Sequence, residues 1–216
     1  MEKDGLVFSH ITEYMRIIRR ERQGKLGDLE RKARAEKFPI SEPETADLID
    51  ILCRLKTPKR ILELGTCIGF SALLMREACP DAQIITIERN PAMITPAKEN
   101  LKEFNAENIK MLEGNAVKIL PTLSEPFDFI FLDAAKGQYP IFLKECLRLL
   151  NPNGILVADN VLFNGYVAKG IPDIRRNKTI ITRLDEFLKM LQSNEELNTV
   201  ILPISDGVTV SFKKEI

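Results

Sequence analysis

The sequence contains one histidine, His10, and no tryptophan among its 216 residues. A single imidazole excludes metal sites that need two histidines and disfavours histidine-based acid–base catalysis. Any chemistry must therefore rest on carboxylates, lysine, amides or the backbone. The cysteines show no Cys-x-x-Cys spacing, so we expect reduced, packed thiols and neither a thiolate metal site nor a disulfide framework. They are Cys53, Cys67, Cys79 and Cys146.

Net charge and long apolar runs are also lacking. Lysine and arginine together number 31 and so do aspartate and glutamate, so no global field points to a nucleic acid or a membrane. No apolar run approaches the roughly 18 residues of a membrane-spanning helix, and the start, MEKDGLVFSH, lacks the pattern of a signal peptide. We expect a cytoplasmic protein with no membrane partner. A hydrophobic content of 44% favours one globular domain over residues 1–216.

One local excess of charge lies near the N-terminus. Between Arg16 and Lys37 the chain carries nine basic residues against four acidic ones. This pattern is typical of a solvated helix pair, and it also suits a surface for a polyanion such as RNA. Ser41 and Glu44 have the spacing of a capping box for a helix that runs to about Leu55. We treat residues 1–57 as an N-terminal helical region.

The segment RILELGTCIGFS, residues 60–71, organises the rest of the chain. A short apolar run ends in an acidic residue and Gly65, and Gly69 opens an apolar, helix-compatible stretch. This pattern predicts a buried parallel strand, a tight turn and a helix N-terminus, which together suit an anion or a nucleotide. Gly65 lets the backbone approach a ligand, and Gly69 lets the helix begin close to the strand.

Downstream, strand-like and helix-like segments alternate. The predicted strands are 83–88, 109–113, 127–133 and 154–159, and the predicted helices are 91–104, 116–123, 139–150 and 178–191. Residues 160–177 form a long irregular stretch of a kind that is often functional. The C-terminal residues predict an antiparallel hairpin around Ser205-Asp206-Gly207. We therefore expect an α/β fold: a doubly wound, mostly parallel sheet with a C-terminal antiparallel hairpin and additional N-terminal helices.

Polar residues stand where the first predicted strands end. Glu63 closes the first strand and Glu88 the second, at about the distance beyond Gly65 where an acidic residue meets a ribose hydroxyl pair. The alternative for Glu88 is a solvated acid at a strand end. After the third strand, Gly114 allows close approach and Asn115 suits an adenine edge, although the same residues also form an ordinary turn and helix cap.

Asp133 and the Asp159-Asn160 pair follow the next two strands. Two carboxylates and an amide oxygen at neighbouring strand ends favour Mg²⁺, Mn²⁺ or Ca²⁺ over zinc. The alternative is that these groups only cap their strands. Lys136, three residues after Asp133, is a candidate base beside such a cation, and an ordinary surface lysine otherwise.

The segments ELGTCIGFS, ITIERN, EGNA, FDFIFLDAAKGQY and LVADNVLFNG resemble the cation-dependent class I O-methyltransferases, the family of catechol and caffeoyl-CoA O-methyltransferases. The resemblance implies a Rossmann-like methyltransferase fold, a homodimer, metal ligands Asp133, Asp159 and Asn160, and catalysis by Asp133 and Lys136. It also implies S-adenosylmethionine contacts at Ile40, Glu63, Gly65, Ser71, Glu88, Gly114, Asn115, Ala116 and Asp133. Cys67 departs from the family pattern, because many methyltransferases have glycine there.

Within this family the chain is most similar to bacterial tRNA 5-hydroxyuridine methyltransferases, which form 5-methoxyuridine at the wobble position of the anticodon loop. The similarity lies in FPISEPETADL, in ADNVLFNG with the basic stretch after it, and in ILPISDGVTVSFKK. It implies RNA contacts at Arg175, Arg176 and Lys178. Other interpretations are a small-molecule methyltransferase acting on catechols or similar vicinal diols, a dinucleotide oxidoreductase, which would leave Asp159 and Asn160 unused, and a noncatalytic RNA-binding module.

Overall fold

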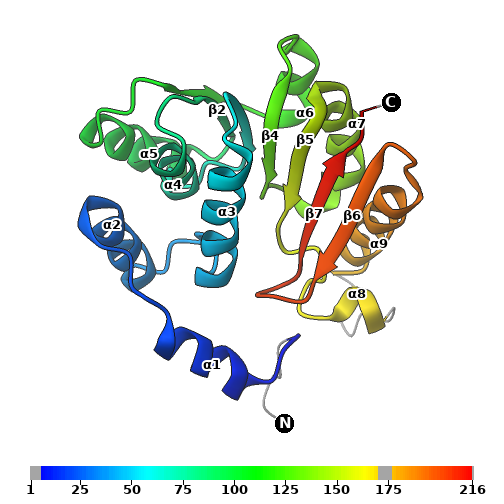
Figure 1. The fold of residues 1–216 in the computed structure, drawn as a ribbon, viewed down its shortest axis with the longest axis horizontal. Helices are drawn as coiled ribbons and strands as arrows, with labels where there is room; N and C mark the ends of the chain where they lie inside the picture. The colour runs from blue at the N-terminus through cyan, green and yellow to red at the C-terminus, as the bar shows by residue number, and fades with distance from the viewer. Residues whose placement is uncertain (1–5, 170–176, 216) are drawn as a thin grey trace.

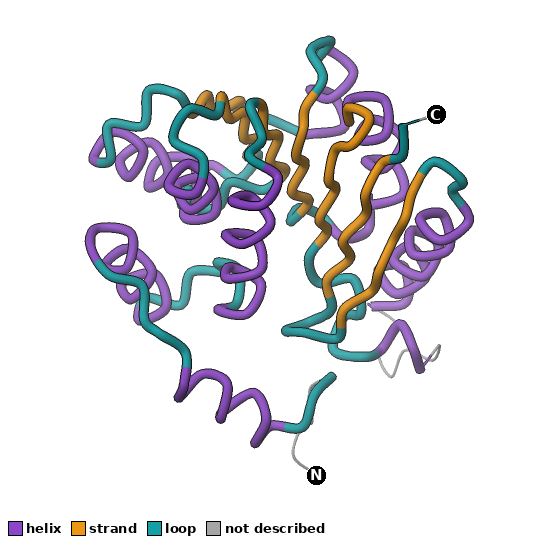
Figure 2. Tube along the Cα trace, in the orientation of Figure 1, coloured by secondary structure: helices purple, strands orange, loops and turns teal. Residues whose placement is uncertain are grey.

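The computed structural model describes residues 6–169 and 177–215. In this part of the chain the strands form one seven-stranded sheet with the order β3-β2-β1-β4-β5-β7-β6 (Figures 1 and 2). The parallel strands are β1 (Arg60–Leu64), β2 (Gln83–Glu88), β3 (Ile109–Glu113), β4 (Phe127–Leu132) and β5 (Leu150–Ala158). The antiparallel strands are β6 (Leu197–Leu202) and β7 (Val208–Lys213). The predicted doubly wound sheet and its C-terminal hairpin are confirmed.

Helices cover both faces of the sheet because side chains alternate along each strand. Ile61 and Phe129 belong to one buried cluster with α3 (Pro43–Lys56) and α4 (Phe70–Ala78). Leu62 and Ile130 belong to a second cluster with α7 (Tyr139–Leu149) and α9 (Lys178–Ser193). The central strands β1 and β4 are therefore almost continuously apolar, as strands buried on both faces must be. The helices that follow β1 and its neighbours are α4 (Phe70–Ala78), α5 (Pro91–Glu103), α6 (Ala116–Ile119), α7 (Tyr139–Leu149), α8 (Tyr166–Lys169) and α9 (Lys178–Ser193). Short 3-10 turns are η1 (Leu120–Thr122) and η2 (Lys136–Gln138).

Three helices precede the sheet: α1 (Ser9–Ile18), α2 (Gly24–Ala35) and α3 (Pro43–Lys56). The predicted capping box is wrong. Glu42 occupies the N-cap position, since Pro43 begins the helix, and the hydroxyl of Ser41 is buried without a hydrogen-bond partner in the described part of the chain. The carboxylate of Glu44 does not reach back to the cap but binds Arg16 of α1, with 2.7 Å between Nε and Oε1.

Arginines of the N-terminal excess are largely paired with carboxylates. Arg16 binds Glu42 and Glu44, whereas Arg19 and Arg22 each contact both Glu30 and Asp47. These pairs attach α1 and α2 to α3, and α1 lies at the lower edge of Figure 1, away from the sheet. The local charge excess therefore serves helix packing to a large extent, which weakens the interpretation of this segment as a surface for RNA.

The largest differences from the sequence-based expectation are in β5 and in the stretch 160–177. Strand β5 begins at Leu150, four residues earlier than predicted, because Leu150 pairs with Phe127 across a register shift that the sequence does not reveal. Part of the stretch 160–177 is helical, as α8. In the described residues no helix has the length and apolar character needed to cross a bilayer.

Candidate active site

The carboxyl ends of β1, β2, β4 and β5 meet at one edge of the sheet. Leu64 pairs with Leu132, and Leu132 pairs with Ala158, so the next residues in each strand are neighbours. The backbone N–H of Asp133 donates to the carbonyl of Leu64 at 2.9 Å, and that of Asp159 donates to the carbonyl of Leu132 at 3.0 Å. Parallel pairing thus places Asp133 and Asp159 side by side, as their positions after two strands predict.

The turn after β1 is built around a close approach of two backbones. Gly65 has φ of +101°, and a Cβ atom at this position would lie 1.9 Å from the carbonyl oxygen of Asp133. Cys67 follows in the left-handed region, and its N–H donates to Oε2 of Glu88 at 2.9 Å. The other oxygen of Glu88 accepts hydrogen bonds from the N–H groups of Arg89 and Asn90. The carboxylate of Glu88 is therefore held in one orientation beside the glycine turn.

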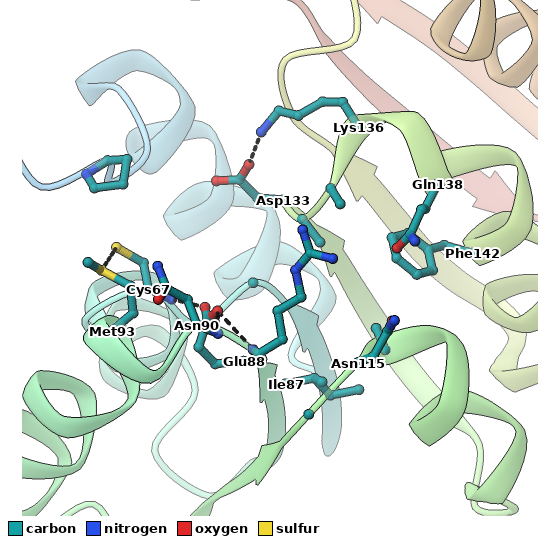
Figure 3. Close-up of a pocket in the computed structure, with 17 residues that line it drawn as sticks. Cys67, Ile87, Glu88, Asn90, Met93, Asn115, Asp133, Lys136, Gln138 and Phe142 are labelled. Atoms are coloured by element: carbon teal, nitrogen blue, oxygen red, sulfur yellow. Dashed lines mark hydrogen bonds and ion pairs between the residues drawn. The ribbon is translucent and has the colours of Figure 1, made fainter. Parts of the chain in front are cut away.

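A pocket opens at this edge of the sheet (Figure 3). Of the predicted site residues, those that line it are Gly65, Glu88, Gly114, Asn115, Ala116, Asp133 and Lys136. The structure adds Cys67, Arg89, Asn90, Met93, Gln138 and Phe142 to its wall. Oδ1 of Asn115 accepts a hydrogen bond from the N–H of Val117, so this side chain caps α6 and also faces the pocket. Asn115 can therefore cap α6 and also contact a ligand in the pocket.

Glu63, Ser71 and Ile40 do not line this pocket. Glu63 is fully buried, and its two oxygens accept hydrogen bonds from the hydroxyls of Ser71 and Thr86, the latter at 2.5 Å. Burial raises the pKa of Glu63 to about 7, and the charges of Asp133 and Glu88 act in the same direction. Glu63 therefore supports the glycine turn through Ser71 and Thr86, and the implied cofactor contacts of Glu63, Ser71 and Ile40 stay predictions.

Lys136 and Asp133 form an ion pair on the pocket wall, with 2.8 Å between Nζ and Oδ1 (Figure 3). Lys136 begins η2, three residues after Asp133, and the short turn brings its amine back to the carboxylate at the strand end. Its side chain is 26% exposed and that of Asp133 is 18% exposed. Lys136 thus lines the same pocket as Asp133, and its role as a base stays a prediction.

Asp159 is the most buried acidic group at this edge after Glu63, with 2% of its surface exposed. Burial raises the pKa of its carboxyl to about 7, and the negative charge of Asp133 raises it further, whereas the hydrogen bond from the N–H of Asn160 opposes the shift. The hydroxyl of Tyr139, which the sequence analysis missed, lies 3.0 Å from the carbonyl oxygen of Asp159 and 3.2 Å from that of Leu132. Tyr139 therefore ties the ends of β4 and β5 together.

Asn160 lies on a second, larger pocket that adjoins this corner. Residues of α1, of the start of α3, of the loop after β5 and of the turn between β6 and β7 line it. Its charged side chains are the acidic Glu13, Glu42, Glu44 and Asp206 and the basic Arg16. The predicted metal ligands thus lie between the two pockets: Asp133 faces the first and Asn160 faces the second.

Comparison with known proteins identifies the family. The family model described as O-methyltransferase matches residues 22–214. The chain belongs to this O-methyltransferase family. A catechol O-methyltransferase from Niastella koreensis is 33% identical, over 80% of this chain and 81% of the relative. A caffeoyl-CoA O-methyltransferase from Populus kitakamiensis is 31% identical, over 75% of this chain and 73% of the relative. The solved structure of the Podospora anserina methyltransferase PaMTH1, with S-adenosylhomocysteine bound, is 30% identical and superposes with a TM-score of 0.85, covering 95% of this chain and 94% of that one.

This O-methyltransferase is therefore an S-adenosylmethionine-dependent enzyme with the class I methyltransferase fold. In its described residues no group of three or more His, Cys, Asp and Glu side chains is placed to hold a metal ion. The predicted ligand set has two carboxylates, and its third member is an amide. Of the predicted RNA contacts, Arg175 and Arg176 lie outside the described residues, and Lys178 is the first residue of α9.

Proposed function

We propose that this O-methyltransferase uses a divalent cation at Asp133, Asp159 and Asn160 to methylate a hydroxyl group that has a second oxygen on the neighbouring carbon. The observation that carries the proposal is the buried carboxylate of Asp159 beside Asp133, which lines the first pocket. Lys136 pairs with Asp133, and the described contacts give the carboxylate of Asp159 one hydrogen bond, from the N–H of Asn160. Two adjacent carboxylates whose negative charges have so few positive or hydrogen-bonding partners suit a bound cation.

The donor set of the site fits Mg²⁺, Mn²⁺ or Ca²⁺, because all three side chains offer oxygen and none offers sulfur or imidazole. When bound, the cation would act as a Lewis acid that favours ionisation of the acceptor hydroxyl and as a template for its position. Asp133, Asp159 and Asn160 would hold it. Lys136 would accept the acceptor's proton, since its amine already lies on the wall of the cofactor pocket.

The first pocket would hold S-adenosylmethionine. Gly65 and Gly114 would allow the cofactor to approach the backbone, and the fixed carboxylate of Glu88 would accept hydrogen bonds from the ribose hydroxyls. Asn115 and Ala116 would face the adenine. Ile40, Glu63 and Ser71 would support this pocket from positions outside its wall.

The cation requirement is tested by titrating the EDTA-treated enzyme with Mg²⁺ and Mn²⁺ while measuring both methyl transfer and Mn²⁺ binding. We expect activity to return with the cation in the wild type. Asp133→Ala should bind no Mn²⁺ and transfer no methyl group, with an unchanged far-UV circular dichroism spectrum. Full activity of the wild type in EDTA would contradict the proposal.

For the acceptor we propose 5-hydroxyuridine at the wobble position of tRNA. The 5-hydroxyl and the 4-carbonyl oxygen of this base are vicinal, so they present to a cation the same pair of oxygens as a catechol. Lys169, Lys178 and Arg183 lie on α8 and α9, close in sequence to the loop after β5. These positively charged side chains suit contacts to RNA phosphates next to the modified base.

A small catechol is the second candidate acceptor. The relative from Niastella koreensis is a catechol O-methyltransferase, and four carboxylates against one arginine line the second pocket, which disfavours a phosphate there. One experiment distinguishes the two acceptors. Methyl transfer is measured in parallel reactions, one with tRNA that contains 5-hydroxyuridine and one with a dihydroxyphenyl compound. Nucleoside mass spectrometry of tRNA from a deletion strain should show accumulated 5-hydroxyuridine if tRNA is the substrate.

We also propose that the enzyme is a homodimer that uses α1. No residue of this helix is buried, and its exposed apolar side chains include Tyr14 at 62%, Ile17 at 74% and Ile18 at 62%. A second copy of the chain would remove this apolar surface from water. Ile17→Glu should shift the mass measured by light scattering from dimer to monomer, whereas Ile141→Glu, at an exposed position of α7, should not. A monomeric wild type would contradict the proposal.

A further inference from the structure

The turn between β6 and β7 lies against the loop that follows β5 and carries Asn160. Oδ1 of Asp206 accepts a hydrogen bond from the N–H of Asn164. The carbonyl oxygen of Asp206 accepts the N–H of Leu162 at 3.0 Å, and that of Gly207 accepts the N–H of Val161 at 2.9 Å. Two residues from a distant part of the chain therefore hold three backbone amides of this loop.

The backbone of the loop needs such support. Asn160, Phe163 and Asn164 have φ values of 57°, 46° and 52°, in the left-handed region that residues other than glycine rarely adopt. Such conformations persist where the surrounding structure fixes them. The hydrogen bonds from the turn are therefore part of what holds Asn160 and its neighbours in this conformation.

Residues of α3 in turn contact the turn between β6 and β7. The hydroxyl of Thr45 lies 3.1 Å from that of Ser205, which lies 3.4 Å from Oε2 of Glu44, so α3 supports the turn from the other side. The N–H of Gly207 donates to the carbonyl of Ile204 at 2.8 Å. A Cβ atom on Gly207 would lie 2.5 Å from Cγ of Leu162, so turn and loop are in tight contact.

We infer that Asp206 is a positioning residue for Asn160, acting through its hydrogen bond to Asn164. Asp206 and Asn160 line the same pocket, and the Oδ1 atom of Asp206 accepts a hydrogen bond from the loop that carries Asn160. The inference rests on the proposed role of Asn160 as a cation ligand. Groups that orient a metal ligand commonly contribute 10-fold to 100-fold to metal affinity.

The test is Mn²⁺ binding to the cofactor-free, full-length protein, followed by electron paramagnetic resonance, with S-adenosylhomocysteine affinity measured by calorimetry. Asp206→Ala should weaken Mn²⁺ binding about 10-fold to 100-fold. Asp206→Asn should keep most of the affinity, because its amide oxygen can accept the same hydrogen bond from Asn164. Asp81→Ala, at an exposed turn before β2, is the matched control and should change nothing. S-adenosylhomocysteine affinity should stay constant throughout, since Asp206 does not line the first pocket.

Unchanged Mn²⁺ affinity in a folded Asp206→Ala protein would overturn the inference. So would an equal loss in Asp206→Asn and Asp206→Ala, because the negative charge would then matter and not the hydrogen bond, and so would a parallel loss of S-adenosylhomocysteine affinity. If Asp206→Ala does not fold, Asp206→Gln provides the same test, since one additional methylene moves the acceptor away from Asn164. A wild type that binds no Mn²⁺ would overturn the proposed cation site itself, and this inference with it.

Discussion

The amine of Lys136 lies 2.8 Å from Oδ1 of Asp133, the residue that directly follows β4 and lines the first pocket. A divalent cation held by Asp133 would compete with this ammonium group for the same carboxylate. Binding of the cation would therefore release Lys136 from its ion pair. Once the ammonium group has lost a proton to solvent, the neutral amine could take the proton of the acceptor.

Lys136→Met keeps the length of the side chain and removes its amine. We expect kcat to fall about 10²-fold to 10⁴-fold, the range for loss of a general base, with little change in S-adenosylhomocysteine affinity. Steady-state kinetics and calorimetry measure the two quantities. Lys144→Met, at an exposed position of α7, is the control and should retain wild-type rates. A Lys136→Met enzyme with an unchanged kcat would rule out the base role.

Gly65→Ala should damage both stability and cofactor binding. Its Cβ atom would meet the carbonyl of Asp133 at 1.9 Å, and alanine is strained at φ of +101°. The backbone strain alone should lower the free energy of unfolding by about 1 to 3 kcal/mol, measured by urea denaturation. Gly137→Ala is the matched control, because nothing lies within 4 Å of the added Cβ atom. Equal stability of the two variants would show that the turn tolerates a side chain.

Glu63→Gln should change how stability depends on pH. The folded protein keeps a proton on Glu63 up to a pKa of about 7, whereas the unfolded chain releases it near 4.5. The folded state therefore binds more protons between these values, and the free energy of unfolding falls as pH rises from about 4.5 to about 7. Urea denaturation in EDTA at pH 5 and pH 8 should show a smaller fall for Glu63→Gln than for the wild type. The same pH dependence in both proteins would contradict the raised pKa.

Glu30→Ala tests the network that attaches the N-terminal helices. The carboxylate of Glu30 contacts Arg34 at 2.9 Å, Arg22 at 3.4 Å and Arg19 at 3.6 Å, and its side chain is 6% exposed. Loss of this acceptor from partly buried guanidinium groups should cost about 1 to 3 kcal/mol of unfolding free energy. Asp28→Ala breaks an exposed pair with Arg31 and should cost less than about 1 kcal/mol. Equal costs would mean that burial of Glu30 adds nothing.

Much of the fold could be predicted because its parallel strands are short apolar runs that end in a polar residue or glycine. The positions of Asp133, Asp159 and Gly65 at one edge of the sheet could be predicted for this reason, since neighbouring parallel strands bring their carboxyl ends together. The cap of α3 could not be predicted, because Arg16 of a separate helix takes the side chain of Glu44. Asp206 and Tyr139 were missed because no local pattern marks a residue whose partners lie far away in the chain.

The sequence by itself determined the order of strands and helices, the glycine turn after β1 and the acidic residues at the strand ends, because apolar periodicity and turn chemistry are local properties. Only the tertiary structure decided which charges meet. It paired Arg19 with Glu30 of α2 and Asp47 of α3, buried Glu63 behind the turn, and set Asp206 against the loop of Asn160. These contacts join residues distant in sequence, and packing of the two helical layers onto the sheet is what brings them within hydrogen-bond range.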